Sequence, residues 1–162
     1  MSVAVDVTAE GVRVPLARAR VAELVRGVLR AERVRDALLS VAFLDDRAMA
    51  RLNREHLGHR GPTDVISFGF AQGASNGPVV GDVYVCPDVA RENARLHGAG
   101  VREEVARLVV HGTLHVLGYD HPEGGERTAS DMWRRQERLL RRLFTDAGAR
   151  ASAPRARRRA TP

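Results

Sequence analysis

The chain has 162 residues, of which 44% are hydrophobic, with one cysteine and a formal net charge of +6. This length and composition fit one globular domain with a buried core, and a single cysteine excludes an intramolecular disulfide. The N-terminal residues show no secretory signal and no apolar run is long enough to cross a membrane, so we expect a cytoplasmic protein with no membrane partner.

Positive charge is concentrated near the C-terminus. The basic residues are all arginine, and residues 146–162 carry five of them against one aspartate, which leaves residues 1–145 only mildly basic. A segment of this kind is typical of proteins that contact a polyanion such as RNA. Short basic tails are also often merely solvated, so both interpretations stay open, and we expect the tail to be disordered.

The first part of the chain predicts a strand, a helix and a second strand. Residues 3–8 alternate valine with small or polar residues, which is typical of a half-buried strand. The apolar run 38–44 is short enough for a central strand. Between them a helix should open near Pro15 and bury one stripe at helical spacing, formed by Val21, Leu24, Val25, Val28 and Leu29.

The middle of the chain predicts a short helix, a loop and two strands. Asp45 or Asp46 can cap a helix that runs to about Glu55. Two glycines and a proline make residues 56–64 a predicted polar loop. Two more strands with a hairpin-like connection are expected at residues 65–70 and 79–86.

Three helices are expected in the last part. Pro87 should open a helix that stops near Gly98, and a second helix should cover about 101–117. A long last helix has one predominantly apolar face, formed by Ala129, Met132, Trp133, Gln136, Leu139, Leu140 and Leu143. The order of elements predicts an α+β fold, with a four-stranded mixed sheet packed against about five helices.

Three of the six histidines, His111, His115 and His121, lie within eleven residues. The four-residue step places two imidazoles on one helix face. Gly118 can end the helix in the left-handed conformation and turn the chain so that His121 approaches the other two. Three imidazoles converging from one side predict one zinc ion with its fourth position open, although nickel, cobalt or copper would accept the same ligands.

The residue after the first histidine argues against peptide hydrolysis. Zinc peptidases with H-E-x-x-H-x-x-G-x-x-H spacing use the glutamate at that position as general base. This chain has Gly112 there, and glycine cannot move a proton. We therefore predict a metal-dependent hydrolase-like domain over residues 1–145, for which a peptide substrate is disfavoured, followed by the arginine-rich tail 146–162.

The chain resembles the YbeY family of bacterial rRNA-maturation endoribonucleases over roughly residues 3–144. The resemblance rests on His111-Gly-Thr-Leu-His115-Val-Leu-Gly-Tyr-Asp-His121, Pro62-Thr-Asp-Val-Ile-Ser-Phe68 and Gly81-Asp-Val-Tyr-Val-Cys-Pro87, with Leu52-Asn53 and Glu104 also fitting. It implies a zinc-dependent, single-strand-specific endoribonuclease that acts in small-subunit rRNA maturation and ribosome quality control. The partners it implies are single-stranded rRNA, the small ribosomal subunit and assembly proteins.

One loop departs from the family pattern. The family usually has an aromatic residue and then an arginine for the RNA backbone, where this chain has His56 and Leu57. Leucine cannot donate to a phosphate, so that role does not carry over. Arg60, His59 or Arg54 could supply the charge from nearby, and we take Arg60 and His59 as candidate phosphate contacts.

Several roles stay open at this stage. The attacking group could be a metal-activated water or the 2′-hydroxyl of the RNA. Asp120 could orient a histidine or cap the turn, and Glu104 could support the site or be an ordinary exposed acid. We expect the few aromatic side chains Phe68, Phe70 and Tyr84 to be core rather than platforms for bases. A zinc-stabilised assembly factor without catalytic activity, or less plausibly a zinc peptidase, is the alternative function.

Overall fold

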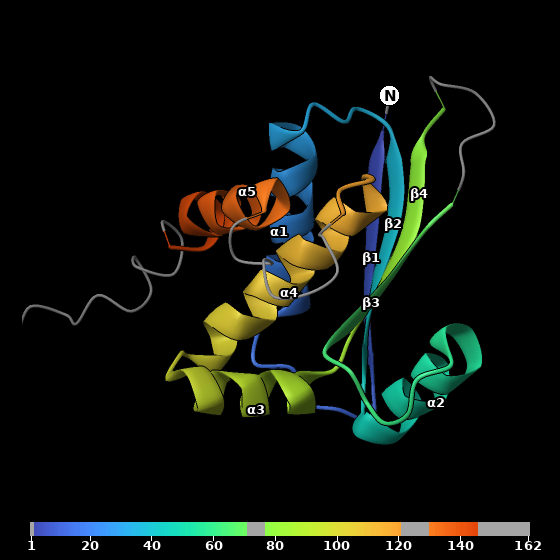
Figure 1. Ribbon diagram of the computed structural model, residues 1–162. Coiled ribbons are helices and arrows are strands. Elements are labelled where there is room, and N and C mark those ends of the chain that lie inside the picture. Colours follow the sequence, from blue (N-terminus) through green and yellow to red (C-terminus); the bar gives the residue numbers. More distant parts are fainter. Residues whose placement is uncertain (1, 71–76, 121–129, 146–162) are drawn as a thin grey trace, which may run out of the picture.

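The structure is a computed structural model that describes residues 2–70, 77–120 and 130–145 (Figure 1). It confirms the predicted α+β fold with a four-stranded mixed sheet. In chain order the elements are β1 (Val3–Glu10), α1 (Arg18–Ala31), β2 (Ala37–Leu44), α2 (Asp46–Leu57), β3 (Val65–Gly69), β4 (Val79–Val85), α3 (Pro87–His97), α4 (Val101–Val116), α5 (Asp131–Leu140) and a π-helical turn, η2 (Arg141–Thr145).

The strand order in the sheet is β1-β2-β4-β3. The β1–β2 and β2–β4 pairs are parallel, because α1 returns the chain to the starting end of the sheet between β1 and β2, and the antiparallel strand β3 returns it between β2 and β4. The β3–β4 pair is antiparallel, with Val65 opposite Val85 and Gly69 opposite Gly81. The expected central position of the apolar strand β2 and the expected pairing of β3 with β4 are therefore confirmed.

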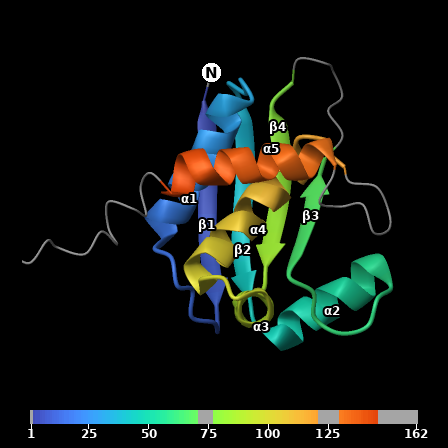
Figure 2. The ribbon, with the colours of Figure 1, turned by 60° about the vertical axis from the view of Figure 1, so that its left-hand side comes forward.

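The helices are unevenly distributed over the two faces of the sheet. The α1 and α4 helices cover one face and α5 lies across them, whereas, among the helices that the structure describes, α2 alone meets the other face, at one end (Figures 1 and 2). Strand β2 shows the consequence, because Leu39, Val41 and Phe43 are buried while Leu38, which points to the other face, is 56% exposed.

The α4 helix lies between the sheet and α5, which explains why most of its residues are buried. Glycines allow it to lie close to the β3–β4 hairpin. A Cβ at Gly81 would lie 2.4 Å from Cγ1 of Val116, and one at Gly112 would lie 2.4 Å from Cγ1 of Val83. Because real atoms do not approach so closely, these two glycines set how near the helix comes to the sheet.

Four predicted boundaries were wrong. The first long helix begins at Arg18 rather than near Pro15, because Ala17 is still extended at its N-cap. The α2 helix continues to Leu57 and ends at Gly58, which takes a left-handed φ of 68°, so the predicted loop starts two residues later. The third and fourth strands each end one residue earlier than expected.

Two further expectations concern the C-terminal tail and membrane-spanning helices. The tail 146–162 lies outside the described residues, and its disorder stays a prediction. Within the described ranges, no helix is both long enough and apolar enough to cross a lipid bilayer.

Candidate metal centre

The structure brings His111 and His115 together on α4. Their ring centroids are 4.6 Å apart and the ring planes meet at 79°. Both side chains are half-buried, next to the fully buried Gly112, Thr113 and Leu114. The four-residue step along a helix that is fixed against the sheet therefore presents two imidazoles side by side.

Gln136 on α5 determines which nitrogen of His111 carries the proton. Nδ1 of His111 lies 2.6 Å from Oε1 of Gln136, and Nε2 of Gln136 donates to a carboxylate oxygen of Glu137 at 3.2 Å. Only the amide nitrogen can donate to a carboxylate, so the amide oxygen faces the imidazole and accepts from Nδ1–H. Nε2 of neutral His111 then keeps its lone pair, as a metal ligand requires.

Gln136 is connected to α4 through Glu137, which forms an ion pair with Arg107. Arg107 donates to Glu137 at 3.1 Å and to Glu104 at 2.6 Å. Burial lowers the pKa of Arg107, but its hydrogen bonds and ion pairs with Glu137 and Glu104 outweigh this and raise the pKa, so the guanidinium stays charged. Glu104 is 7% exposed, which contradicts the interpretation as an ordinary surface acid. Its connection to His111 runs through Arg107, Glu137 and Gln136 rather than through a direct contact.

The end of α4 turns the chain in the way that the sequence predicted. Gly118 has a φ of 97°, its N–H donates to the carbonyl of His115, and Tyr119 N–H donates to the carbonyl of Leu114. This pair of hydrogen bonds is a Schellman motif, in which the left-handed residue satisfies the last carbonyls of the helix.

Tyr119, the residue after this turn, is fixed by a hydrogen bond to α1. The Tyr119 hydroxyl donates to Glu32 at the end of α1, and Arg135 of α5 donates to the other oxygen of the same carboxylate, both at 2.6 Å. The hydrogen bond to Glu32 raises the pKa of Tyr119, since the phenol must keep its proton to donate. The chain is thus anchored two residues before His121.

His121 itself lies outside the described residues, so the convergence of all three histidines stays a prediction. Among the residues that the structure describes, no group of three histidine, cysteine or acidic side chains could hold a metal. Asp120 is the last described residue of this stretch and is exposed. Its proposed roles, orienting a histidine or capping the turn, also stay predictions.

The candidate phosphate contacts lie elsewhere. His59 and Arg60 are exposed in the loop after α2, and neither lines the pocket that contains His111. The structure thus does not bring these two side chains into contact with the histidine pair. The loop is tied to α2 by Asn53, whose side-chain amide donates to the Gly61 carbonyl at 2.9 Å.

Aromatic side chains on the open face of the sheet are less buried than we expected. The ring of His56 meets that of Phe68 edge-on at 5.4 Å, and Phe68 meets Tyr84 at 5.9 Å. Leu57 is 49% exposed and Phe70 is 53% exposed, so the assignment of Phe70 to the core was wrong. The physical reason is that the helices cover the opposite face.

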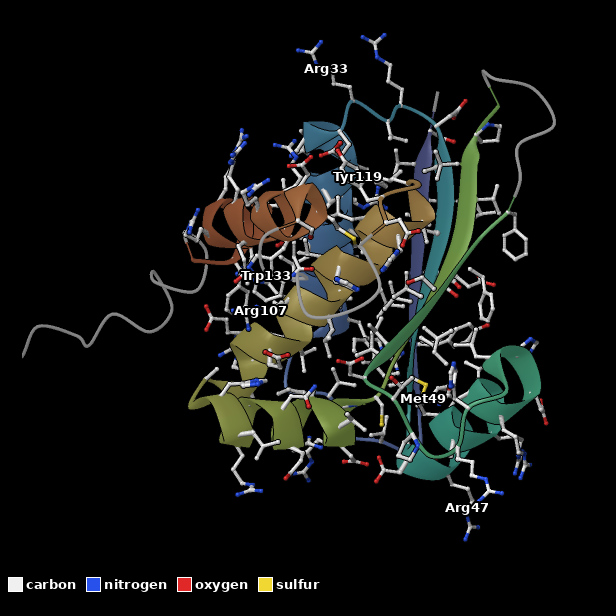
Figure 3. All side chains as sticks on the ribbon, in the orientation of Figure 1. Arg33, Arg47, Met49, Arg107, Tyr119 and Trp133 are labelled. Atoms are coloured by element: carbon white, nitrogen blue, oxygen red, sulfur yellow. The ribbon has the colours of Figure 1, made fainter. Side chains whose placement is uncertain are left out.

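A pocket of about 600 Å³ adjoins the histidine pair and has His111 in its wall. It lies between α3, α4, α5 and the start of β3. Figure 3 labels two of its side chains, Arg107 and Trp133, near the crossing of α4 and α5. The other lining residues are Asp64, Val65, Asn93, His97, Ala99, Glu104, Leu108, Ser130, Met132 and Gln136.

Sequence reasoning had not assigned most of this pocket to the site. The one available signal was Gln136, a polar residue in the apolar stripe of the last helix, which is 1% exposed. A buried amide needs hydrogen-bond partners, so its position in the stripe indicated a specific contact. Asp64, Asn93 and Trp133 gave no such signal, because three separate elements bring them together.

Gly112 faces the sheet rather than the histidine side of α4. A Cβ there would meet Val83 at 2.4 Å, the Ser67 hydroxyl at 3.0 Å and Val65 at 3.2 Å. A glutamate at this position would have to displace the sheet. The packing therefore gives a second reason, besides the missing carboxylate, why this site lacks the general base of zinc peptidases.

Comparisons with known proteins give relatives over most of the chain. The family model described as endoribonuclease YbeY matches residues 6–144. The chain is 40% identical over 132 residues to the endoribonuclease YbeY of Frankia alni, covering 75% of this chain and 72% of that protein. It is 37% identical over 153 residues to that of Bacillus licheniformis, covering 88% and 96%.

A solved structure supports the fold alone. The solution structure of TM1509 from Thermotoga maritima superimposes with a TM-score of 0.62 and 23% sequence identity, and the match covers 93% of this chain and 95% of that one.

Proposed function

This chain belongs to the YbeY family of endoribonucleases, and from this premise we propose that it is a zinc-dependent enzyme that cleaves single-stranded RNA. Its place would be the cytoplasm, in the maturation of small-subunit rRNA and in ribosome quality control, with the small subunit and assembly proteins as partners. The observation that carries the proposal is the His111–His115 pair, with Gln136 fixing the proton of His111.

The donor set suits zinc. His111, His115 and His121 would hold the ion, and imidazoles with an outer hydrogen-bond acceptor are typical zinc ligands. Bound zinc supplies a Lewis acid that activates water and polarises a phosphoryl oxygen. The 2′-hydroxyl of the RNA stays an alternative nucleophile.

The residues of the chain have separable tasks in this proposal. Gln136 keeps the Nδ1 proton of His111 in place, and Glu137, Arg107 and Glu104 hold Gln136 through the chain of hydrogen bonds and ion pairs. Arg60 and His59 are the candidates for binding the RNA phosphate, since positive charge stabilises the negative charge that develops there.

The proposal is tested by measuring zinc content and RNA cleavage together. The full chain and His115→Ala would be compared on single-stranded and double-stranded rRNA fragments, with circular dichroism to show that the variant is folded. Arg47→Ala is the control, because Arg47 is exposed on α2 and outside the pocket. We expect one zinc ion per chain, and loss of both zinc and cleavage in His115→Ala only.

Two results would contradict the proposal. Equal cleavage by His115→Ala and the unmodified chain would place the activity elsewhere. Stoichiometric zinc without any cleavage would favour an assembly factor whose metal stabilises the junction after α4.

A further inference from the structure

The side chains that line the pocket beside His111 suit an aromatic ring as ligand. Its walls include the apolar side chains of Val65, Leu108, Met132 and Trp133. Its volume of about 600 Å³ lies within the range usual for sites that bind small organic groups. Trp133 is half-buried, so part of its indole remains accessible for stacking.

The charges of the pocket disfavour a phosphate there. Arg107, the one arginine among the lining residues that the structure describes, already pairs with Glu104 at 2.6 Å and Glu137 at 3.1 Å. Asp64 adds another carboxylate to the lining. Because Arg107 is already paired with two carboxylates and Asp64 adds a further negative charge, a group that donates hydrogen bonds is favoured over an anion.

Asp64 and Asn93 supply a recognisable polar pattern. The Asn93 amide donates to Oδ2 of Asp64 at 3.2 Å, while Oδ1 of Asp64 accepts from the N–H of Val65 at 2.8 Å. Each carboxylate oxygen can accept a second hydrogen bond, and the amide nitrogen carries a second hydrogen. The pair therefore presents two acceptors, the carboxylate oxygens of Asp64, and one donor, the Asn93 amide, at the edge of an apolar pocket.

Guanine is the RNA base that matches this pattern. Its Watson–Crick edge has two adjacent donors, N1–H and N2–H, next to the acceptor O6. Uracil has one donor between two acceptors, and adenine and cytosine each have one amino group as donor on this edge, so none of these bases offers two adjacent donors to the two carboxylate oxygens. In a duplex this edge is already paired, so only an unpaired base could use the pocket.

We propose that this pocket binds an unpaired guanine base of the RNA next to the scissile phosphate, with Asp64 and Asn93 reading its Watson–Crick edge and Trp133 stacking on its ring. The inference rests on the proposed function, because His111 is shared by the pocket and the metal centre. It gives a structural reason why the enzyme would prefer single-stranded RNA. It also predicts that the enzyme prefers guanine at one position near the cleaved bond.

Trp133 makes the proposal directly measurable, because it is the only tryptophan of the chain. The full chain would be titrated with the 5′-monophosphates of guanosine, adenosine, cytidine and uridine while tryptophan fluorescence is recorded. This readout needs no cleavage. We expect guanosine monophosphate to bind at least tenfold more tightly than uridine monophosphate, as for other paired contacts to a base edge.

A matched pair of variants identifies the reading residue. Asp64→Asn keeps the side-chain shape but removes one carboxylate, and should weaken guanosine monophosphate binding on the order of tenfold. Asp131→Asn makes the same chemical change at a side chain that is 96% exposed and does not line the pocket, and should leave binding unchanged. Circular dichroism would establish that both variants are folded.

The outcomes separate this inference from the proposed function. Equal binding of all four nucleotides, or no fluorescence change with any of them, would overturn the base pocket, even if zinc-dependent cleavage is found. Guanine-selective binding that Asp64→Asn weakens would support the pocket, even if no cleavage is found. Mapping the cut sites should then show guanine at one fixed offset.

Discussion

The two regions from which the site was predicted differ in how firmly the fold holds them. His111 and His115 lie on α4, a helix packed between the sheet and α5 and fixed by close contacts at Gly81 and Gly112. Arg60 and His59 lie in an exposed loop after α2. Metal ligands need fixed relative positions, whereas a side chain that meets an extended polyanion can tolerate a less constrained backbone.

The supporting contacts follow the same division. Around α4, His111 contacts Gln136, and the ion pairs of Arg107 continue that contact along the helix. At the loop, Asn53 holds the Gly61 carbonyl. Substitutions around α4 should therefore affect metal binding and stability, whereas substitutions in the loop should affect RNA binding with little change in either.

The largest effect is expected for Gln136→Met, which removes the acceptor for Nδ1–H of His111 at nearly constant volume. Loss of such an outer contact typically weakens metal binding by about 10- to 100-fold. Zinc affinity measured against a competing chelator would test this without any assay of activity. Arg138→Ala, an exposed change on the same helix, is the control, and equal affinities in the two variants would mean that Gln136 does not position the ligand.

A smaller effect is expected when the close approach of α4 to the sheet is disturbed. Gly112→Ala places a Cβ 2.4 Å from Val83 and should lower the free energy of unfolding by about 1–3 kcal/mol, the usual cost of overpacking. Gly100→Ala precedes the same helix and has no atom within 4 Å of its Cβ. Chemical denaturation of both would compare them, and a Gly112→Ala protein as stable as Gly100→Ala would contradict the packing argument.

The role of the loop after α2 in RNA binding is tested by Arg60→Ala. Arg47→Ala, at the other end of α2, is the control. Figure 3 shows that Arg47 points away from the body of the protein. We expect Arg60→Ala to weaken RNA binding about fivefold to tenfold and to flatten its salt dependence, because one phosphate contact is lost. Zinc content and stability should not change. Equal salt slopes in the two variants would remove Arg60 from the site.

The smallest effect is expected for Cys86, which directly follows β4 and forms a hydrogen bond with the start of α2. Its thiol is buried and donates to Asp46 at 3.2 Å, and burial, with that acid, raises the pKa of Cys86 from 9.0 to about 12. The unfolded thiol therefore ionises first as the pH rises, so the free energy of unfolding should fall between about pH 9 and 12. In Cys86→Ala, the free energy of unfolding should fall less over this pH range, because the thiol is absent.

The comparison of the two denaturation curves across that pH range isolates the thiol from the tyrosines that also titrate there. Parallel curves would show that Cys86 ionises equally in the folded and unfolded states. Slow labelling of the thiol in the folded protein by an alkylating reagent would be the matching kinetic result, since the thiolate is the reactive form.

The sequence by itself determined the local features. Hydrophobic periodicity located the strands and helices, because alternation and 3.6-residue spacing reflect which side of an element is buried. The His111–His115 step and Gly118 predicted a ligand pair and a left-handed turn, since both depend only on residues within one helical segment. The errors at Pro15 and Leu57 occurred at element ends, where competing local preferences are nearly equal.

Only the tertiary structure decided which distant residues meet. Gln136 reaches His111 because α5 lies across α4, and Asp64, Asn93 and Trp133 share a pocket because three elements converge there. It also decided that Phe70 is exposed and Glu104 buried, because within the described ranges the helices cover mainly one face of the sheet. Such contacts depend on how elements pack, and short-range sequence patterns carry no information about packing between elements far apart in the chain.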